Sequence, residues 1–195
     1  MAEASSLRLF VAVELPEHVR DALAAVQDAL RREVSGRLRW TAPTGIHLTL
    51  KFLGEVPETR VGVITAALRE ASAGQAPFAL TLSGTGVFPN ARSPRVVWVG
   101  LGGDVDALGR LQARVEGSLV AAGFPAEDRD FRPHLTLARV ADRLSGGQRE
   151  TLVERVKGAL VPEVEPFQVK GVSLMRSILQ PTGSVYERQA EATLG

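Results

Sequence analysis

The tetrapeptide His-Leu-Thr-Leu occurs twice in this chain, at residues 47–50 and again 87 positions later at residues 134–137. The chain has only three histidines, and two of them, His47 and His134, begin these two copies. Each copy alternates polar and apolar residues, which is the period of a β-strand with one buried face and one free face. The pattern therefore predicts two strands that each present a histidine and a threonine on the free face, with the leucines in the core.

The elements around the two motifs follow the same order, which predicts an internal duplication. Helices are indicated by apolar residues at steps of three and four, and strands by short runs rich in Val, Leu and Phe. The first half is predicted to contain a strand at 8–15, a helix at 16–35, a strand at 46–54, a helix after Pro57 and a strand at 78–82. The second half is predicted to contain a strand at 95–101, a helix at 104–121, a strand at 131–140, a helix after the capping box of Ser145 and Gln148, and strands at 167–175 and 184–190. Gly and Pro residues indicate a loop at 84–94.

This order predicts the fold class. We expect an α+β protein in which residues 1–195 form a single bilobal domain, with repeat halves at approximately 7–90 and 94–190, each a strand-helix-strand-helix-strand unit. The offset of 87 that superposes the histidines also superposes Arg8 on Arg95. A pseudo-twofold axis between the halves would make the two histidines face each other across a shared space, which we expect to be the active site.

Counting in twos along each strand predicts which side chains share a face with the histidines. The predicted faces hold His47, Thr49 and Lys51 in the first half and Arg132, His134 and Thr136 in the second. Together they offer two imidazoles, two hydroxyls and two fixed cations, and they include no carboxylate. Such a set suits an anion bound between the two strands.

Phosphoryl transfer is the chemistry that this set favours. A neutral imidazole can take a proton from the attacking oxygen while an imidazolium gives one to the departing oxygen, and a pKa near 6.5 makes both forms available near neutrality. Hydroxyls and cations can stabilise the charge on the non-bridging oxygens. The scheme needs no metal and no other cofactor.

Other kinds of site fit the residues less well. A two-histidine metal site would lack a nearby Asp or Glu in either motif, whereas metal sites usually recruit three or four ligands. A duplication kept only for packing would retain the leucines but would not need His and Thr on the outer face. The chain contains neither a phosphate-binding loop ending in Lys-Ser or Lys-Thr nor a G-x-S-x-G motif, and it has no cysteine.

Composition limits the partners. A formal net charge of +1 argues against a broad basic surface for long nucleic acid, although a local basic cleft is still allowed. The amino-terminal residues fit no export signal, and no window approaches the ~20 apolar residues of a membrane span. We therefore expect a cytoplasmic protein without a membrane partner. A complete internal repeat makes a monomer sufficient.

Several stretches together resemble the two-histidine (2H) phosphoesterases. They are the opening RLFVAVELP, HLTLKFLGEV, FRPHLTLAR and the late LMRSILQPTGSVYE, which occur in family order over nearly the whole chain. The branch is that of the RNA 2',3'-cyclic phosphodiesterases, historically called 2'-5' RNA ligases. The resemblance implies a bilobal α+β fold with antiparallel sheets lining a central cleft. It also implies metal-independent hydrolysis of 2',3'-cyclic phosphate ends of RNA or small nucleotides to a 2'-phosphate.

The resemblance also assigns roles to residues. His47 and His134 would be the acid/base pair, and Thr49 and Thr136 would hold the phosphate. The family pattern has an arginine shortly after the second motif, which corresponds to Arg139. Strict alternation sends that residue to the face opposite His134, so either the strand bulges after Leu137 or the arginine acts from elsewhere.

Both basic residues near the second motif, Arg132 and Arg139, are kept as substrate-binding candidates. Phe10, on the opening strand, is a candidate to stack on a base, with a place in the core as the alternative. The motifs are symmetric and leave the order of the two histidine roles open; the working assignment is His47 as acid and His134 as base.

Two other functions would use the same residues. End joining is the same chemistry in reverse, with a 5'-hydroxyl in place of water. A non-catalytic module that binds RNA ends or nucleotides is the alternative from another class.

Overall fold

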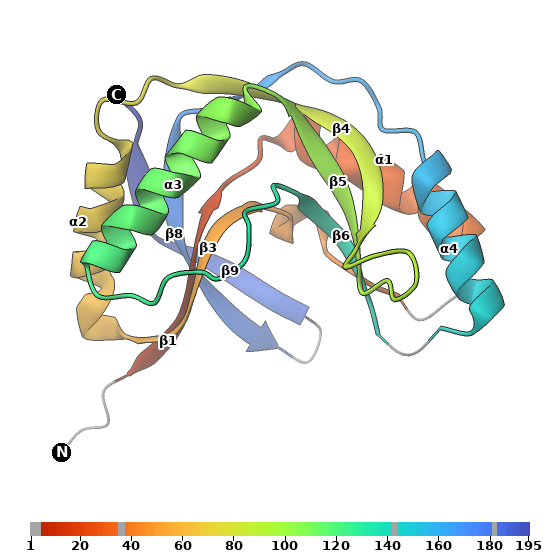
Figure 1. Cartoon of the computed structure of the whole chain (residues 1–195), viewed down its shortest axis with the longest axis horizontal. Coiled ribbons are helices and arrows are strands. Elements are labelled where there is room, and N and C mark those ends of the chain that lie inside the picture. Colours follow the sequence, from red (N-terminus) through yellow and green to blue (C-terminus); the bar gives the residue numbers. More distant parts are fainter. Residues whose placement is uncertain (1–4, 35–37, 142–143, 181–182) are drawn as a thin grey trace.

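The computed structural model describes residues 5–34, 38–141, 144–180 and 183–195, and two antiparallel sheets form its centre (Figure 1). Sheet A has four strands in the order β3-β1-β8-β9, and sheet B has five in the order β2-β6-β5-β4-β7. The strands of sheet A are β1 (Ser6–Val13), β3 (Leu48–Pro57), β8 (Gly171–Gln180) and β9 (Gly183–Thr193). Those of sheet B are β2 (Leu38–Trp40), β4 (Phe78–Phe88), β5 (Val96–Gly103), β6 (Leu135–Val140) and β7 (Phe167–Val169).

In the part of the chain that the structure describes, four α-helices pack against the sheets, two on each. They are α1 (Glu17–Glu33), α2 (Val61–Ser72), α3 (Val105–Ala121) and α4 (Gly146–Gly158), with short 3-10 turns η1 (Pro43–Gly45) and η2 (Glu58–Arg60). Helices α2 and α3 lie together at one end of the molecule, against strands of sheet A, and α1 and α4 lie at the other end (Figure 1). The buried Gln27 of α1 donates a hydrogen bond to the carbonyl of Leu137 in β6, which ties this helix to sheet B. The α+β class with two antiparallel sheets is the one predicted.

The predicted order of elements is present twice, but the sheets do not coincide with halves of the sequence. β1 and β3 of the first half lie in sheet A with β8 of the second half. β5 and β6 of the second half lie in sheet B with β4 of the first half. Sheet A also takes β9 from the second half, and sheet B also takes β2 from the first half, so each sheet contains two strands of the other half. This exchange interlocks the two halves, and one hydrophobic core contains residues of both sheets.

The leucines of the two motifs lie in that core, as their alternation predicted. Leu48, Leu135 and Leu137 are fully buried, and Leu50 is 4% exposed. Burying a leucine side chain contributes roughly 1.5–3 kcal/mol to the free energy of unfolding. The four leucines therefore hold the two motif strands against the core and leave the other face of each strand free.

Some element boundaries differ from the prediction for identifiable reasons. The loop predicted at 84–94 is strand up to Phe88, because Gly86 serves packing here: a Cβ atom on it would lie 2.2 Å from the Trp98 ring. The second motif strand begins only at Leu135, because residues 131–134 are not in a regular element. The strand predicted at 167–175 is divided into β7 and β8, which belong to different sheets, and β2 was not predicted. The capping box of α4 is present as predicted.

Within the described part of the chain, none of the helices combines the length and the hydropathy that crossing a bilayer requires.

Candidate active site

The two motifs meet at a cavity of about 370 Å³ between the sheets. His47 and Thr49 line it from the sheet A side, and His134 and Thr136 line it from the sheet B side. Arg139 also lines it, at the end of β6. The structure thus brings five of the eight predicted site residues together around one space, and Phe10 adds a sixth.

Each histidine ring is oriented by a hydrogen bond to the backbone carbonyl two residues earlier in the chain. The Nδ1 atom of His47 lies 2.9 Å from the carbonyl oxygen of Gly45, and that of His134 lies 2.7 Å from the carbonyl oxygen of Arg132. A carbonyl oxygen can only accept, so Nδ1 carries the hydrogen in both rings. This leaves Nε2 of each ring as the atom that can accept or release a proton.

The surroundings of the two rings differ. The Phe10 ring stacks on His47 at 4.5 Å between centroids, and the Tyr186 ring meets His47 edge-on at 4.9 Å. His134 has one aromatic neighbour among the described residues, Phe88, which meets it edge-on at 4.9 Å. His47 is therefore the more enclosed of the two.

Burial and charge shift both histidine pKa values downwards. Burial lowers the pKa of His47 from 6.5 to about 4; the hydrogen bond to Gly45 and the charge of Glu14 oppose this shift, and the charge of Arg139 adds to it. Burial is also the main cause that lowers the pKa of His134, and Arg139 adds to that shift as well. The charge of Arg139 thus acts on both rings, and all three residues line the same cavity.

A β-bulge explains why Arg139 reaches the cavity. In the pairing of β5 with β6, Val97 lies opposite Ala138 and Trp98 opposite Thr136, so Leu137 is skipped. The extra residue inverts the alternation after it. Of the two alternatives left open by the sequence, the bulge after the motif is the one that occurs.

The same bulge in the first half removes Lys51 from the site. Val11 lies opposite Lys51 and Ala12 opposite Thr49, so Leu50 is skipped. Lys51 then points to the core side and is 5% exposed, and Phe52 lines the cavity instead. The prediction that Lys51 shares a face with His47 and Thr49 is wrong, because counting in twos assumed a strand without a bulge.

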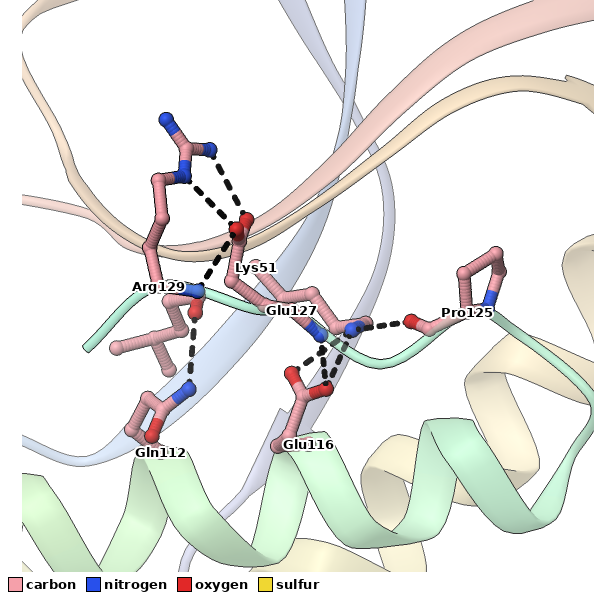
Figure 2. Close-up of polar contacts among 7 residues, drawn as sticks. Lys51, Gln112, Glu116, Pro125, Glu127 and Arg129 are labelled. Carbon is pink, nitrogen blue, oxygen red and sulfur yellow. Dashed lines mark hydrogen bonds and ion pairs between the residues drawn. The ribbon is translucent and has the colours of Figure 1, made fainter. Parts of the chain in front are cut away.

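Lys51 binds a different set of groups (Figure 2). Its Nζ atom donates to both carboxylate oxygens of Glu116 on α3, at 2.7 and 2.8 Å, and to the carbonyl of Pro125 at 2.8 Å. Glu116 also accepts a hydrogen bond from the backbone N–H of Glu127 at 2.9 Å. Lys51 therefore joins β3 to α3 and to the loop that leads to His134, and all three of its N–H donors are satisfied.

Arg132 also differs from its predicted place. It precedes β6, its side chain is exposed, and it does not line the cavity. Its backbone carbonyl holds Nδ1 of His134 instead. The prediction that the Arg132 side chain shares a strand face with His134 is wrong, because the strand begins only after the histidine.

Phe10 is in the site, but its ring is 2% exposed and is stacked on His47. It therefore packs against a histidine, and the core alternative describes it better than base stacking does. Phe52 also lines the cavity and is 61% exposed, so it is far more accessible to a base than Phe10 is.

Sequence reasoning missed Arg8, Thr41 and Tyr186, which also line the cavity. Tyr186 and Arg8 lie in two of the stretches that carry the family resemblance, LMRSILQPTGSVYE and RLFVAVELP, and that was the available signal. Nothing in the position of Tyr186, far from both motifs along the chain, indicated that it would pack on His47.

No three His, Asp or Glu side chains gather as a metal-binding group within residues 5–34, 38–141, 144–180 and 183–195. The histidine pair also has no acidic residue among the described residues that line the cavity.

Two stretches of this chain, residues 13–98 and 102–186, each match the family model described as LigT like phosphoesterase. The RNA 2',3'-cyclic phosphodiesterase of Methanothermobacter thermautotrophicus is 37% identical over 180 residues, which cover 92% of this chain and 95% of the relative. The RNA 2',3'-cyclic phosphodiesterase of Thermus thermophilus is 38% identical over 185 residues, which cover 92% and 86%.

Solved structures show the same similarity. The crystal structure of the Thermus thermophilus protein TT0787 matches with a TM-score of 0.76 and 34% identity, covering 96% of this chain and 98% of that one. Escherichia coli LigT complexed with 3'-AMP matches with a TM-score of 0.75 and 25% identity, covering 97% and 99%. The chain therefore belongs to the LigT-like phosphoesterases, the two-histidine class that its fold and paired motifs define. Within that family it falls in the branch of the RNA 2',3'-cyclic phosphodiesterases.

Proposed function

We propose that this protein hydrolyses 2',3'-cyclic phosphate ends of RNA or nucleotides to 2'-phosphates by acid/base catalysis with His47 and His134, without a metal. The observation that carries the proposal is the pair of identically tethered imidazoles at one cavity, each with Nε2 available for proton transfer. The names of the relatives support the choice of substrate.

The reaction needs one proton taken and one given. The neutral imidazole takes a proton from water as the water oxygen bonds to phosphorus. The bond from phosphorus to O3' breaks, and the imidazolium gives its proton to O3', which leaves a 3'-hydroxyl and a 2'-phosphate. The two imidazoles end with their protonation states exchanged, and proton exchange with solvent restores them.

The remaining site residues stabilise the charge. The hydroxyls of Thr49 and Thr136 donate hydrogen bonds to the non-bridging oxygens, where negative charge accumulates in the transition state. Arg139 supplies a positive charge near both imidazoles. Its cation disfavours the protonated imidazoles in the free protein, and the bound phosphate offsets this effect because it brings negative charge to the same place.

The free-protein pKa values bear on the order of the two roles. Because His47 is the more strongly shifted, it is the less protonated ring before substrate binds, which is opposite to the working assignment of His47 as acid. Substrate adds an anion beside both rings and raises both pKa values, so the order in the complex is decided by which ring faces O3'.

The test is turnover of a 2',3'-cyclic mononucleotide in the presence of EDTA, with the products resolved as 2'- and 3'-phosphates. We expect a 2'-phosphate at an undiminished rate. Turnover only after addition of a divalent metal, or a 3'-phosphate as the product, would contradict the scheme. Adding an RNA with a 5'-hydroxyl end to the same assay measures end joining.

A substrate whose 3'-oxygen is replaced by sulfur assigns the roles. A thiolate leaves without protonation, so this substrate restores the rate of the variant that lacks the acid and does not restore that of the variant that lacks the base. Under the working assignment, His47→Ala regains activity and His134→Ala does not. The reverse result would exchange the two roles.

A further inference from the structure

A second cation, Arg8, lies on the wall of the cavity. Apolar residues of β1 alternate into the core at Leu7, Leu9 and Val11, so Arg8 and Phe10 lie on the opposite, cavity-facing side. Arg8 is exposed and lines the cavity together with Phe10. Arg8 is thus positioned by β1, the strand whose Phe10 ring stacks on His47.

Arg8 and Arg139 occupy different parts of the cavity. The charge of Arg139 lowers the pKa of both histidines, whereas Arg8 is not among the groups that shift either of them. The strand register agrees: Arg8 lies opposite Glu55 in β3, while Thr49 lies opposite Ala12, four residues further along β1. At ~3.3 Å per residue, the backbone of Arg8 is about 13 Å along the strand from the threonine that faces the reacting phosphate.

Arg8 has no ion pair or side-chain hydrogen bond to another described residue. Its strand partner Glu55 accepts a hydrogen bond from Ser6 instead, at 3.1 Å. By contrast, Arg176 on the neighbouring β8 pairs with Glu187 at 3.6 Å. An uncompensated guanidinium that faces a cavity is suited to a phosphate, to which it can donate two parallel hydrogen bonds.

The wall next to Arg8 suits a nucleoside. Phe52 lies opposite Phe10 in the strand register, so along β1 it falls between Arg8 and Ala12, the residue opposite Thr49. Phe52 is 61% exposed and lines the cavity, and Leu179 of β8 also lines it and is 67% exposed. Large apolar side chains exposed on a cavity wall commonly mark a binding surface. Arg8, this apolar surface and Arg139 thus line the same cavity.

We propose that Arg8 binds a second phosphate of the substrate, the one on the 5' side of the nucleoside that carries the cyclic phosphate. The preferred substrate class is then an oligonucleotide end, or a 5'-phosphorylated cyclic nucleotide, over a nucleoside cyclic phosphate with a 5'-hydroxyl. This inference rests on the proposed function, because the reacting phosphate must sit between the histidines.

The test compares kcat/KM for two substrates, a 2',3'-cyclic nucleotide with a 5'-hydroxyl and the same nucleotide with a 5'-phosphate. In the unaltered protein the 5'-phosphate raises kcat/KM by about 10- to 100-fold, the range expected for hydrogen bonds to a charged group. In Arg8→Gln this ratio falls to near one. Arg176→Gln, which removes the same charge from the adjacent strand outside the cavity, retains the ratio.

Each outcome decides the inference. A ratio near one in the unaltered protein, or an unchanged ratio in Arg8→Gln, overturns it. An equal fall of the ratio in Arg8→Gln and Arg176→Gln also overturns it, because general attraction between charges would then explain the effect. Absence of turnover with both substrates in the unaltered protein would instead contradict the proposed function, so the two failures are distinguishable.

Discussion

The two copies of the motif keep the same backbone and differ in what surrounds it. In both, the histidine Nδ1 donates to the carbonyl two residues earlier, the threonine lines the cavity, and the second leucine forms a bulge. Around His47 two aromatic rings close the site, whereas one ring edge meets His134. The duplication thus keeps the hydrogen bond that orients each imidazole and lets the environment of each ring vary.

The positions after the bulge show the same divergence. Lys51 and Phe52 in the first half correspond to Ala138 and Arg139 in the second at the offset of 87. In the first half the cation is turned inwards to an ion pair and the phenyl ring faces the cavity. In the second half a small alanine is buried and the cation faces the cavity. One half therefore supplies a charge to the site, and the other uses its charge to hold the structure.

The first prediction tests whether the two histidines of the duplicated motif are equally important for turnover. His47→Ala and His134→Ala each lower kcat/KM by about 10³-fold, because either change removes one of two required proton transfers. The measurement is hydrolysis of a 2',3'-cyclic mononucleotide. His18→Ala, which alters the exposed third histidine, serves as control and retains the rate. A binding module would instead retain most of its affinity for a 2'-nucleotide in all three variants.

The second prediction contrasts the two cations. Lys51→Met lowers the free energy of unfolding by about 3 kcal/mol, because it leaves Glu116 without its partner and frees the carbonyl of Pro125. Arg139→Met changes stability by less than ~0.5 kcal/mol, since its side chain is exposed, but lowers kcat/KM by about 10- to 100-fold. Urea unfolding and steady-state kinetics separate the two effects. Equal losses of stability would remove the contrast.

The third prediction concerns the enclosed ring. An unfolded histidine binds a proton below about pH 6.5, whereas folded His47 does so only below about 4. The unfolded state therefore binds more protons across this window, and the free energy of unfolding falls as the pH drops from 6.5 towards 4, by roughly 2–3 kcal/mol from this ring. His47→Gln makes the curve flatter over the same window. A curve unchanged by His47→Gln would contradict the enclosed environment.

The fourth prediction tests whether the two hydroxyls are equivalent. Thr49→Val and Thr136→Val keep the shape of the side chain and remove the donor, so each lowers kcat/KM by about 10-fold with little change in stability. Steady-state kinetics on both variants sharpens the comparison. A loss confined to one of them would show that a single half holds the phosphate.

The sequence predicted the features that depend on local period and repetition. The two motif strands, their buried leucines, the order of the helices and the capping box of α4 all follow from such patterns. Strand exchange between the sheets could not be predicted in this way, because β8 joins β1 and β2 joins β6 across long stretches of sequence, and such pairing leaves no local pattern. The offset of 87 also fails on the first strand, where Trp98 takes the place of Ala12 at an offset of 86.

The site side chains likewise divide into those that a local pattern predicts and those that depend on the folded arrangement. A four-residue stretch of regular alternation predicted the histidine and threonine of each motif, namely His47 with Thr49 and His134 with Thr136. Lys51 was misplaced because a bulge has no signal in the alternation of a single strand. The corresponding bulge in β6 explains the place of Arg139. Tyr186 and Arg8 enter the cavity from strands outside the two His-Leu-Thr-Leu motifs; both lie in stretches that resemble the family, but only the folded arrangement places them in the cavity.

The pH dependence of kcat/KM tests most directly whether both histidines act in one reaction. The base must be neutral and the acid protonated, so the account predicts a bell-shaped profile whose acidic limb disappears in one histidine variant and whose basic limb disappears in the other. A profile that is flat between pH 5 and 8, or that keeps both limbs in either variant, would contradict it.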